Sequence, residues 1–295
     1  MKCRFLSYQV TAAAVVAVVG LVSMPASAQY GATDPAADGA KKGTMHSGAT
    51  PRIADGKPDL SGIWEPADSG LHLILRKDAE GRPTKILFPA PDADFSKADA
   101  QQRARRAAAP NQPPYKPELL EKVKYLDMHT NEFDGALHCM PLGVPRMGPP
   151  QQIVQTPGQV VFLYEGGQSS INTFRVIPTD GRAHGTDVEP SYLGDSVAHW
   201  EGATLVVDVT GFNDLSWIAP DGHFHSEAMH VTERFTRDGD SLKYEVTVED
   251  PHVFTRPWTM NPRQLKLNTD ASAAIEENPP CADKDSAHLV NSEHH

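Results

Sequence analysis

Short runs of alternating apolar and polar residues dominate the chain after Gly158. Each run is rich in β-branched and aromatic residues and is bounded by turn residues, which is typical of half-buried strands. Glu201-Gly202 and Asp238-Gly239-Asp240 separate consecutive runs and are typical of hairpin turns. Strands joined by tight turns pair in antiparallel fashion, so the sequence predicts a mainly β domain, either a barrel or a sandwich. The runs cover residues 159–165, 171–177, 196–200, 203–209, 229–237, 242–248 and 264–268.

Short helical and proline-rich insertions precede these strands. Residues 94–109 are rich in Ala, Gln, Lys and Arg, and residues 117–126 begin with a proline, so both segments favour a helix. The prolines of residues 110–114 predict an extended linker between them. Residues 29–50 contain almost no bulky apolar groups that would offset the entropy of ordering. We therefore expect a flexible tether over 29–50 and a single β-rich domain over 51–295.

The first 28 residues carry the three parts of a Sec-type signal peptide. Lys2 and Arg4 precede an apolar run over residues 10–22, and Pro25-Ala26-Ser27-Ala28 follows it. The run is shorter than the roughly 20 residues that a membrane-spanning helix needs. The sequence predicts cleavage after Ala28, a periplasmic or extracellular mature protein, and no membrane anchor after cleavage.

Charge and cysteine content narrow the range of partners. The formal net charge is −11, and removal of the signal peptide makes it more negative, which disfavours binding to nucleic acid or anionic lipid. Cys139 and Cys281 remain in an oxidising compartment, so we expect a disulfide between them, with two buried thiols as the alternative. The chain contains no CxxC pair, and a zinc or redox role for these cysteines has no support. The oligomeric state is left open.

Glu233 is the first candidate for chemistry. Alternation along residues 229–237 places it on the same face as apolar neighbours. A carboxyl group in such surroundings is desolvated, which raises its pKa and suits a general acid. The alternative is a structural ion pair with an arginine such as Arg175 or Arg146, because structural pairs perturb pKa values as well.

Histidines gather just before and within this strand. His223 and His225 lie in the segment that leads into His230, together with Asp221 and Glu227. Their spacing matches no well-known metal motif, so acid–base use of His225 or His230 is the favoured interpretation. We therefore predict no cofactor, with a divalent metal as the alternative.

Further candidates lie at a strand end and among the tryptophans. Asp208 and Asn213 fall where a strand opens into a loop, a common place for functional residues, and turn capping is the alternative role for such side chains. Trp200 and Trp217 are candidates for the lining of an aromatic ligand pocket, with core packing as the alternative.

Arg146 ends a loop over residues 139–146 that prolines and a glycine stiffen. Such a loop would aim the guanidinium at an anionic group, or would let it pair with a core acid. The sequence contains no GxSxG elbow, P-loop, HExxH motif or GxGxxG after a strand, which disfavours serine hydrolase, nucleotide and nicotinamide chemistry.

Several segments resemble those of a widespread family of uncharacterised exported bacterial proteins. They cover residues 55–64, 139–146, 153–158, 179–182, 200–202, 205–208, 211–214 and 230–235. The resemblance implies one secreted domain and transfers no mechanism. Gly62-Ile63-Trp64 also resembles the GxW opening of lipocalin-like barrels. That resemblance implies an antiparallel barrel of the lipocalin or calycin kind, with a pocket for a small, partly apolar ligand.

These observations lead to one favoured functional hypothesis and three alternatives. The favoured one is a cofactor-independent hydrolase, lyase or isomerase that acts on a small, partly apolar or glycan-like substrate. Glu233 and a histidine would be its acid and base, and Arg146 or Arg175 would hold an oxyanion. The alternatives are a non-catalytic barrel that binds a small ligand, a metal-dependent hydrolase, and an envelope scaffold without a pocket. An enzyme of the favoured kind must bring Glu233, a histidine and an arginine together at one cleft.

Overall fold

The computed structural model describes residues 48–67, 109–165, 173–271 and 273–275, and the backbone of two short strands at 75–77 and 83–85. The predicted signal peptide, most of the tether, Cys281 and the helix predicted over 94–109 except its last residue therefore lie outside the described residues. Within the described residues, no helix combines the length and apolarity needed to cross a membrane.

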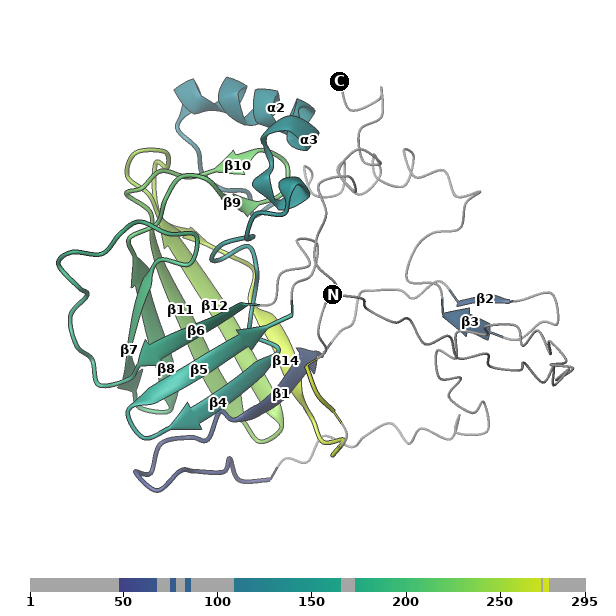
Figure 1. Ribbon diagram of the computed structural model, residues 1–295, viewed down its shortest axis with the longest axis vertical. Coiled ribbons are helices and arrows are strands. Elements are labelled where there is room, and N and C mark those ends of the chain that lie inside the picture. The colour runs from purple at the N-terminus through teal and green to yellow at the C-terminus, as the bar shows by residue number, and fades with distance from the viewer. Residues whose placement is uncertain are drawn as a thin grey trace, which may run out of the picture. The chain divides into compact units, whose positions relative to one another are not determined.

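One antiparallel sheet forms the main body of the fold (Figure 1). Its hydrogen-bonded order is β6-β5-β4-β1-β14-β12-β11-β8-β7, and β13 (Trp258–Thr259) pairs with β12 beside this path. Half of the eight neighbouring pairs in this order are consecutive strands of the sequence, as expected for strands joined by hairpins. The strands are β1 (Gly62–Pro66), β4 (Gln152–Thr156), β5 (Gln159–Tyr164), β6 (Thr173–Pro178), β7 (Asp195–Glu201), β8 (Thr204–Thr210), β11 (His230–Asp238), β12 (Ser241–Glu249) and β14 (Arg263–Asn268).

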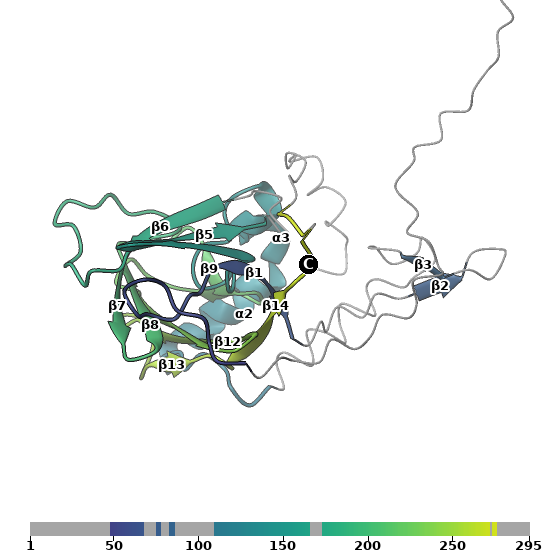
Figure 2. The same ribbon diagram turned by 90° about the horizontal axis from the view of Figure 1, so that it is seen from below.

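The two end strands of this order, β6 and β7, lie side by side and almost close the sheet into a barrel (Figure 2). No backbone ladder joins these two described strands. Instead, the Gly181 amide after β6 donates to the Ala198 carbonyl of β7 over 2.9 Å. The Arg175 guanidinium of β6 also donates to the Ser196 hydroxyl of β7 over 2.8 and 3.2 Å. The predicted mainly β, antiparallel barrel-like fold is confirmed, and we call the β6–β7 boundary the seam.

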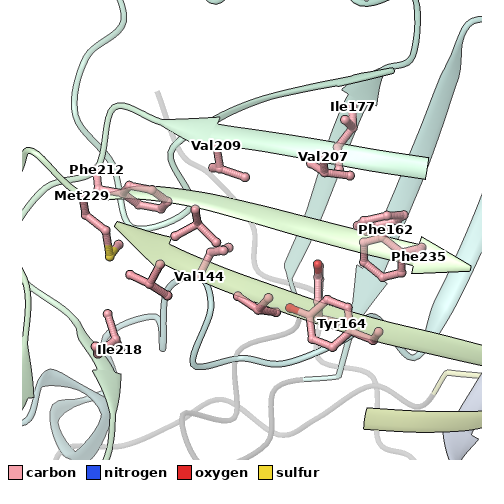
Figure 3. Packing of buried hydrophobic residues seen from close by; sticks show 14 of the residues in the cluster. Val144, Phe162, Tyr164, Ile177, Val207, Val209, Phe212, Ile218, Met229 and Phe235 are labelled. Atoms are coloured by element: carbon pink, nitrogen blue, oxygen red, sulfur yellow. The ribbon is translucent and has the colours of Figure 1, made fainter. Parts of the chain in front are cut away.

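Side chains of alternate residues fill the barrel interior (Figure 3). Along β11 and β12 every second residue is buried, which matches the pleat of a strand with one face on a core. Phe235 of β11 packs against Phe162 of β5 and Tyr244 of β12, with ring centroids 4.9 and 5.0 Å apart. Trp64 of β1 is also buried, and its indole N–H donates to the Leu60 carbonyl over 2.9 Å. The core therefore occupies the interior, and along β11 and β12 the residues between the buried ones face outward.

Helical segments and a small two-stranded sheet cover one end of the barrel (Figure 1). The helix predicted over 117–126 is present as a 3-10 turn followed by an α-helix that runs slightly further. The Tyr115 and Phe254 rings pack together beneath this cap, with centroids 5.0 Å apart, and Tyr115 donates to the Phe224 carbonyl. The cap consists of η2 (Pro117–Leu119), α2 (Leu120–Met128), α3 (Thr130–Phe133), η3 (Gly135–His138), β9 (Trp217–Ala219) and β10 (His223–Phe224). A separate hairpin pairs β2 (Leu75–Lys77) with β3 (Pro83–Lys85).

Candidate functional site

A buried polar cluster lies inside the barrel behind the seam. Glu233 contacts the Arg175 guanidinium over 2.6 Å and accepts a hydrogen bond from the Tyr244 hydroxyl over 2.8 Å. Arg175 also donates to the Tyr164 hydroxyl over 3.1 Å and to Ser196. All five side chains are buried. We call these five residues the buried cluster. The contact between Arg175 and Glu233 confirms the alternative in which Glu233 forms a structural ion pair with an arginine.

Burial and the neighbouring charges determine which groups of the buried cluster are ionised. It raises the pKa of the Tyr164 and Tyr244 phenols, and the nearby Glu233 carboxylate raises the pKa of Tyr244 further. Burial alone would lower the pKa of Arg175, but Glu233 and Tyr164 together outweigh it and the pKa is raised. Both phenols are therefore neutral: Tyr244 donates to Glu233, Tyr164 accepts from Arg175, and the guanidinium keeps its charge.

A cleft of about 460 Å³ opens over the seam, and its lining includes two members of the buried cluster. Arg175 and Ser196 contribute its buried polar groups, because both are nearly inaccessible to solvent. Phe174 on the outer face of β6 contributes an apolar wall, with 62% of its surface exposed. The lining of this seam cleft is Phe174, Arg175, Val176, Pro178, Arg182, Ala183, Gly185, Ser191, Leu193, Gly194, Asp195, Ser196 and Val197.

The hydroxyl proton of Ser196 is available to donate a hydrogen bond at this cleft. Its oxygen accepts both hydrogen bonds from Arg175, so its own proton is not used in those two bonds. In the described part of the chain no other hydrogen bond to this hydroxyl is found. The cleft therefore combines a hydroxyl donor and a guanidinium with apolar walls.

A second cleft of about 600 Å³ lies beside β1 and β14. Trp64, Met147 and several prolines make its lining more apolar than that of the seam cleft. Arg263 is exposed there, so this cleft has a charged group at its surface and no buried ion pair among its described lining residues. The two clefts differ in chemistry.

Asp208 and His230 lie on the outer face of the barrel, in a row of alternating carboxylates and imidazoles. Asp208 joins His184 and His230, each over 2.7 Å. His184 contacts Asp195 over 2.8 Å, and His230 contacts Glu249 over 3.1 Å. We call these five residues the outer chain. His184 was missed by the sequence analysis, because it lies in an irregular loop and nothing local links it to Asp208.

Electrostatics couple the members of the outer chain. Burial lowers the pKa of His184, but hydrogen bonds to Asp208 and Asp195 outweigh it, so the pKa is raised above its ordinary value. Burial raises the pKa of Asp208, yet hydrogen bonds from His184 and His230 outweigh it and the pKa is lowered. Both shifts favour the charged forms.

His225 lies in a third place, at the capped end of the barrel. Its Nδ1 is 3.0 Å from the Ser226 carbonyl, which only accepts, so Nδ1 carries the proton. Its Nε2 therefore accepts from the Ser216 hydroxyl over 3.1 Å. Burial lowers the pKa of His225, which favours the neutral base. We call this the Ser216–His225 pair.

Arg146 forms a bidentate ion pair with Asp134, with two contacts of 2.6 Å between nearly buried side chains. The alternative in which this arginine pairs with a core acid is therefore confirmed. Its guanidinium carbon lies 6.0 Å from the ring centroid of Trp217, which is buried in the core. Neither residue lines the seam cleft.

The remaining predicted residues are scattered. Trp200 is half-buried, and the Lys57 ammonium lies 5.9 Å from its ring centroid. Asn213 caps a turn by accepting from the Leu215 amide over 3.2 Å. Cys139 ends η3, while Cys281 lies outside the described residues, so their disulfide stays a prediction.

No family model matches the chain, and no curated protein matches it. Among solved structures, the chain is similar to a mutant of the fluorescent protein UnaG, with 15% sequence identity and a TM-score of 0.25. The similarity covers 47% of this chain and 88% of that one.

The structure does not bring the predicted acid–base partners together. Glu233 and His230 are three residues apart on β11, and an odd spacing on a strand places side chains on opposite faces. Glu233 therefore points into the barrel, while His230 lies on its outer face. His225 contacts neither of them through its ring nitrogens.

Metal ligands are not gathered in the described residues either. Among those residues, no group of three or more His, Cys, Asp or Glu side chains is arranged to hold a metal ion. In the outer chain each imidazole nitrogen already faces a carboxylate oxygen.

Proposed function

We propose that the protein binds a small, partly apolar molecule in the seam cleft. The observation that carries this proposal is the buried Arg175–Ser196 contact within a cleft that Phe174, Val176 and Pro178 also line. Ligand sites in proteins typically combine apolar walls with a few fixed polar groups, and the cleft volume falls in their usual range of roughly 300–1,000 Å³. This is the binding alternative from the sequence analysis.

The polar groups define the ligand class. The charge of Arg175 is already balanced by Glu233, so the ligand does not need a full negative charge. The Ser196 hydroxyl and the Arg175 guanidinium are both hydrogen-bond donors. A matching ligand therefore carries a hydrogen-bond acceptor, such as a carbonyl, carboxylate or sulfonate oxygen. Phe174 and Val176 would contact the apolar part of the ligand.

Fluorescence titration with anilinonaphthalene sulfonate tests the proposal, because this probe joins apolar rings to an acceptor group. Phe174→Ser should weaken probe binding about tenfold or more, since an apolar side chain in contact contributes about 1.5–3 kcal/mol when fully buried. Val154→Ser is the matched control, because Val154 is an exposed residue of β4 that does not line the cleft. Equal affinities for the two variants would refute binding at the seam.

The Ser216–His225 pair favours hydrolysis of a small ester as a second candidate function. A serine whose hydroxyl donates to a neutral, carbonyl-oriented histidine has the arrangement used by activated nucleophiles. This differs from the Glu233–histidine mechanism that the sequence favoured, and it requires a serine nucleophile outside the GxSxG elbow, whose absence had disfavoured serine hydrolase chemistry.

A fluorophosphonate reagent tests this second candidate. The Ser216 oxygen would bond to phosphorus, fluoride would leave, and His225 would take the hydroxyl proton. We expect a mass increase on Ser216 that disappears in His225→Ala and persists in Ser196→Ala. The absence of labelling in the native protein would argue against a nucleophilic Ser216.

We further propose export with removal of residues 1–28, and a disulfide between Cys139 and Cys281. Both proposals rest on the sequence: the three-part N-terminal segment and the pair of cysteines that remains after it is removed. Mass spectrometry of the exported protein should find an N-terminus at Gln29. A non-reduced peptide map should contain one cross-linked peptide with both cysteines, and two separate thiol peptides would contradict the pairing.

A further inference from the structure

We infer that protonation of His184 regulates the seam cleft, by attaching one wall of the cleft to the barrel at neutral and lower pH and releasing it at alkaline pH. This inference rests on the proposed function, because it concerns the affinity of the same cleft. Its basis is the position of His184 in the loop that joins β6 to β7, residues 179–194.

That loop supplies much of the seam cleft. Six of the lining residues come from it, namely Arg182, Ala183, Gly185, Ser191, Leu193 and Gly194. Its two ends are held by backbone bonds, from the Gly181 amide to the Ala198 carbonyl and between Ser191 and residues 211–213. The position of the central part of the loop therefore helps to shape the cleft.

The central part of the loop has few attachments. Within the described contacts, residues 183–190 form hydrogen bonds to the barrel only through the His184 ring and the Gly185 amide. The Gly185 amide donates to Asp195 over 3.3 Å, and His184 shares that same carboxylate oxygen. His184 thus makes most of the hydrogen bonds between this part of the loop and the barrel, while Val188 lies close to Gly211.

The two links of His184 require a positive ring. Nδ1 faces the Asp195 carboxylate at the start of β7, and Nε2 faces the Asp208 carboxylate of β8. An ionised carboxylate only accepts hydrogen bonds, so both ring nitrogens must carry protons. Loss of one proton removes one of the two links and places a lone pair against a carboxylate oxygen.

The other charged groups around the His184 ring either stabilise its positive charge or interact with the ring through Asp208. His230 of β11 shares Asp208 with His184, and its second nitrogen faces Glu249 of β12. On the loop itself, Arg182 pairs with Asp180, and Asp187 and Glu189 are exposed acids. The surroundings of His184 are therefore mainly acidic, which stabilises the imidazolium.

The direction of the pH effect follows from the raised pKa of His184. A group whose pKa is higher in the folded state than in the unfolded chain contributes fully below its unfolded value, near pH 6.5, and loses that contribution as pH rises through the folded value. The loop should therefore be held more tightly at pH 6 than at pH 9.

Amide hydrogen exchange of the intact protein tests the switch without any ligand. After correction for intrinsic exchange rates, protection of residues 183–190 should fall about threefold to tenfold from pH 6 to pH 9 in the native protein. His184→Gln, which cannot titrate, should show the low protection at both pH values. His199→Gln is the matched control, because His199 is an exposed histidine of β7 that contacts Glu201, and it should behave as the native protein does. Unchanged protection across this range, or a pH response retained in His184→Gln, would overturn the inference.

Titration with anilinonaphthalene sulfonate at the two pH values then links the switch to the cleft. The native protein and His199→Gln should bind the probe about threefold to tenfold more weakly at pH 9, while His184→Gln should bind equally weakly at both. A loop that responds to pH without a change in probe affinity would overturn regulation of the cleft. Probe binding that Phe174→Ser leaves unchanged would instead refute the proposed function, while the exchange result would still decide the loop switch.

Discussion

β11 contributes Glu233 to the buried cluster on its inner face and His230 to the outer chain on its outer face. The two networks contain similar ionisable groups but differ in their role. Glu233 faces inward to Arg175 in the barrel interior, and its ion pair is shielded from water. His230 faces outward and joins side chains that keep about a quarter to a half of their surface exposed. Burial makes the first network a fixed structural element, while partial exposure lets the second respond to pH.

Removal of the Glu233 charge should give the largest difference in stability between the two networks. Glu233→Gln leaves Arg175 as a buried, uncompensated cation, so the free energy of unfolding should fall by about 3–5 kcal/mol. Glu249→Gln in the outer chain is the matched change and should cost less than about 1 kcal/mol. Urea denaturation at pH 7 measures both, and similar losses in the two variants would contradict the contrast.

Replacement of the whole buried pair should undo much of that loss. The double variant Arg175→Met with Glu233→Leu leaves no unpaired charge, so it should be about 2 kcal/mol more stable than Glu233→Leu alone. The same urea experiment provides the measurement. A double variant as unstable as the single one would indicate that the tyrosine hydrogen bonds, rather than the ion pair, determine the stability of the interior.

The pH dependence of stability should distinguish the outer chain. His184→Gln should be less stable than the native protein by about 1 kcal/mol or less at pH 6, because the side chains are partly exposed. The difference should shrink as pH rises towards 9, since the raised pKa of His184 means that its contribution is lost in that direction. Denaturation curves at pH 6, 7.5 and 9 measure it, and a difference that grows with pH would have the wrong sign.

The smallest expected effect is a shift of the His184 midpoint. His230→Gln removes a ring that shares the Asp208 carboxylate with His184, so Asp208 should bind His184 more strongly and His184 should titrate a few tenths of a pH unit higher. NMR titration of the His184 ring protons measures this shift. A lower midpoint would show that the two rings do not compete for Asp208.

Alternation predicted the inward position of Glu233 from the sequence, because the period of a strand is local information. The same pattern could not choose between Arg175 and Arg146 as its partner. That choice depends on closure of the barrel, which brings β6 and β7 together from the two ends of the strand order. The sequence of neither strand indicates that the other will lie beside it. Burial and alternation therefore predict the face of a residue, while its partner depends on topology.

The outer chain shows the same limit. Asp208 and His230 were candidates as single residues, and their spacing from His184 gave no sign of contact. The antiparallel register pairs Thr232 with Asp208 and thereby brings His230 near that carboxylate. Site residues that converge through register in this way cannot be identified from a single sequence.

The most direct test of the account is to map bound anilinonaphthalene sulfonate by ¹H–¹⁵N NMR. We predict that the largest shifts occur in the amides of residues 174–176 and 193–197, which line the seam cleft. Shifts centred instead on Trp64, Met147 and Arg263 would place the probe in the second cleft and contradict the central claim.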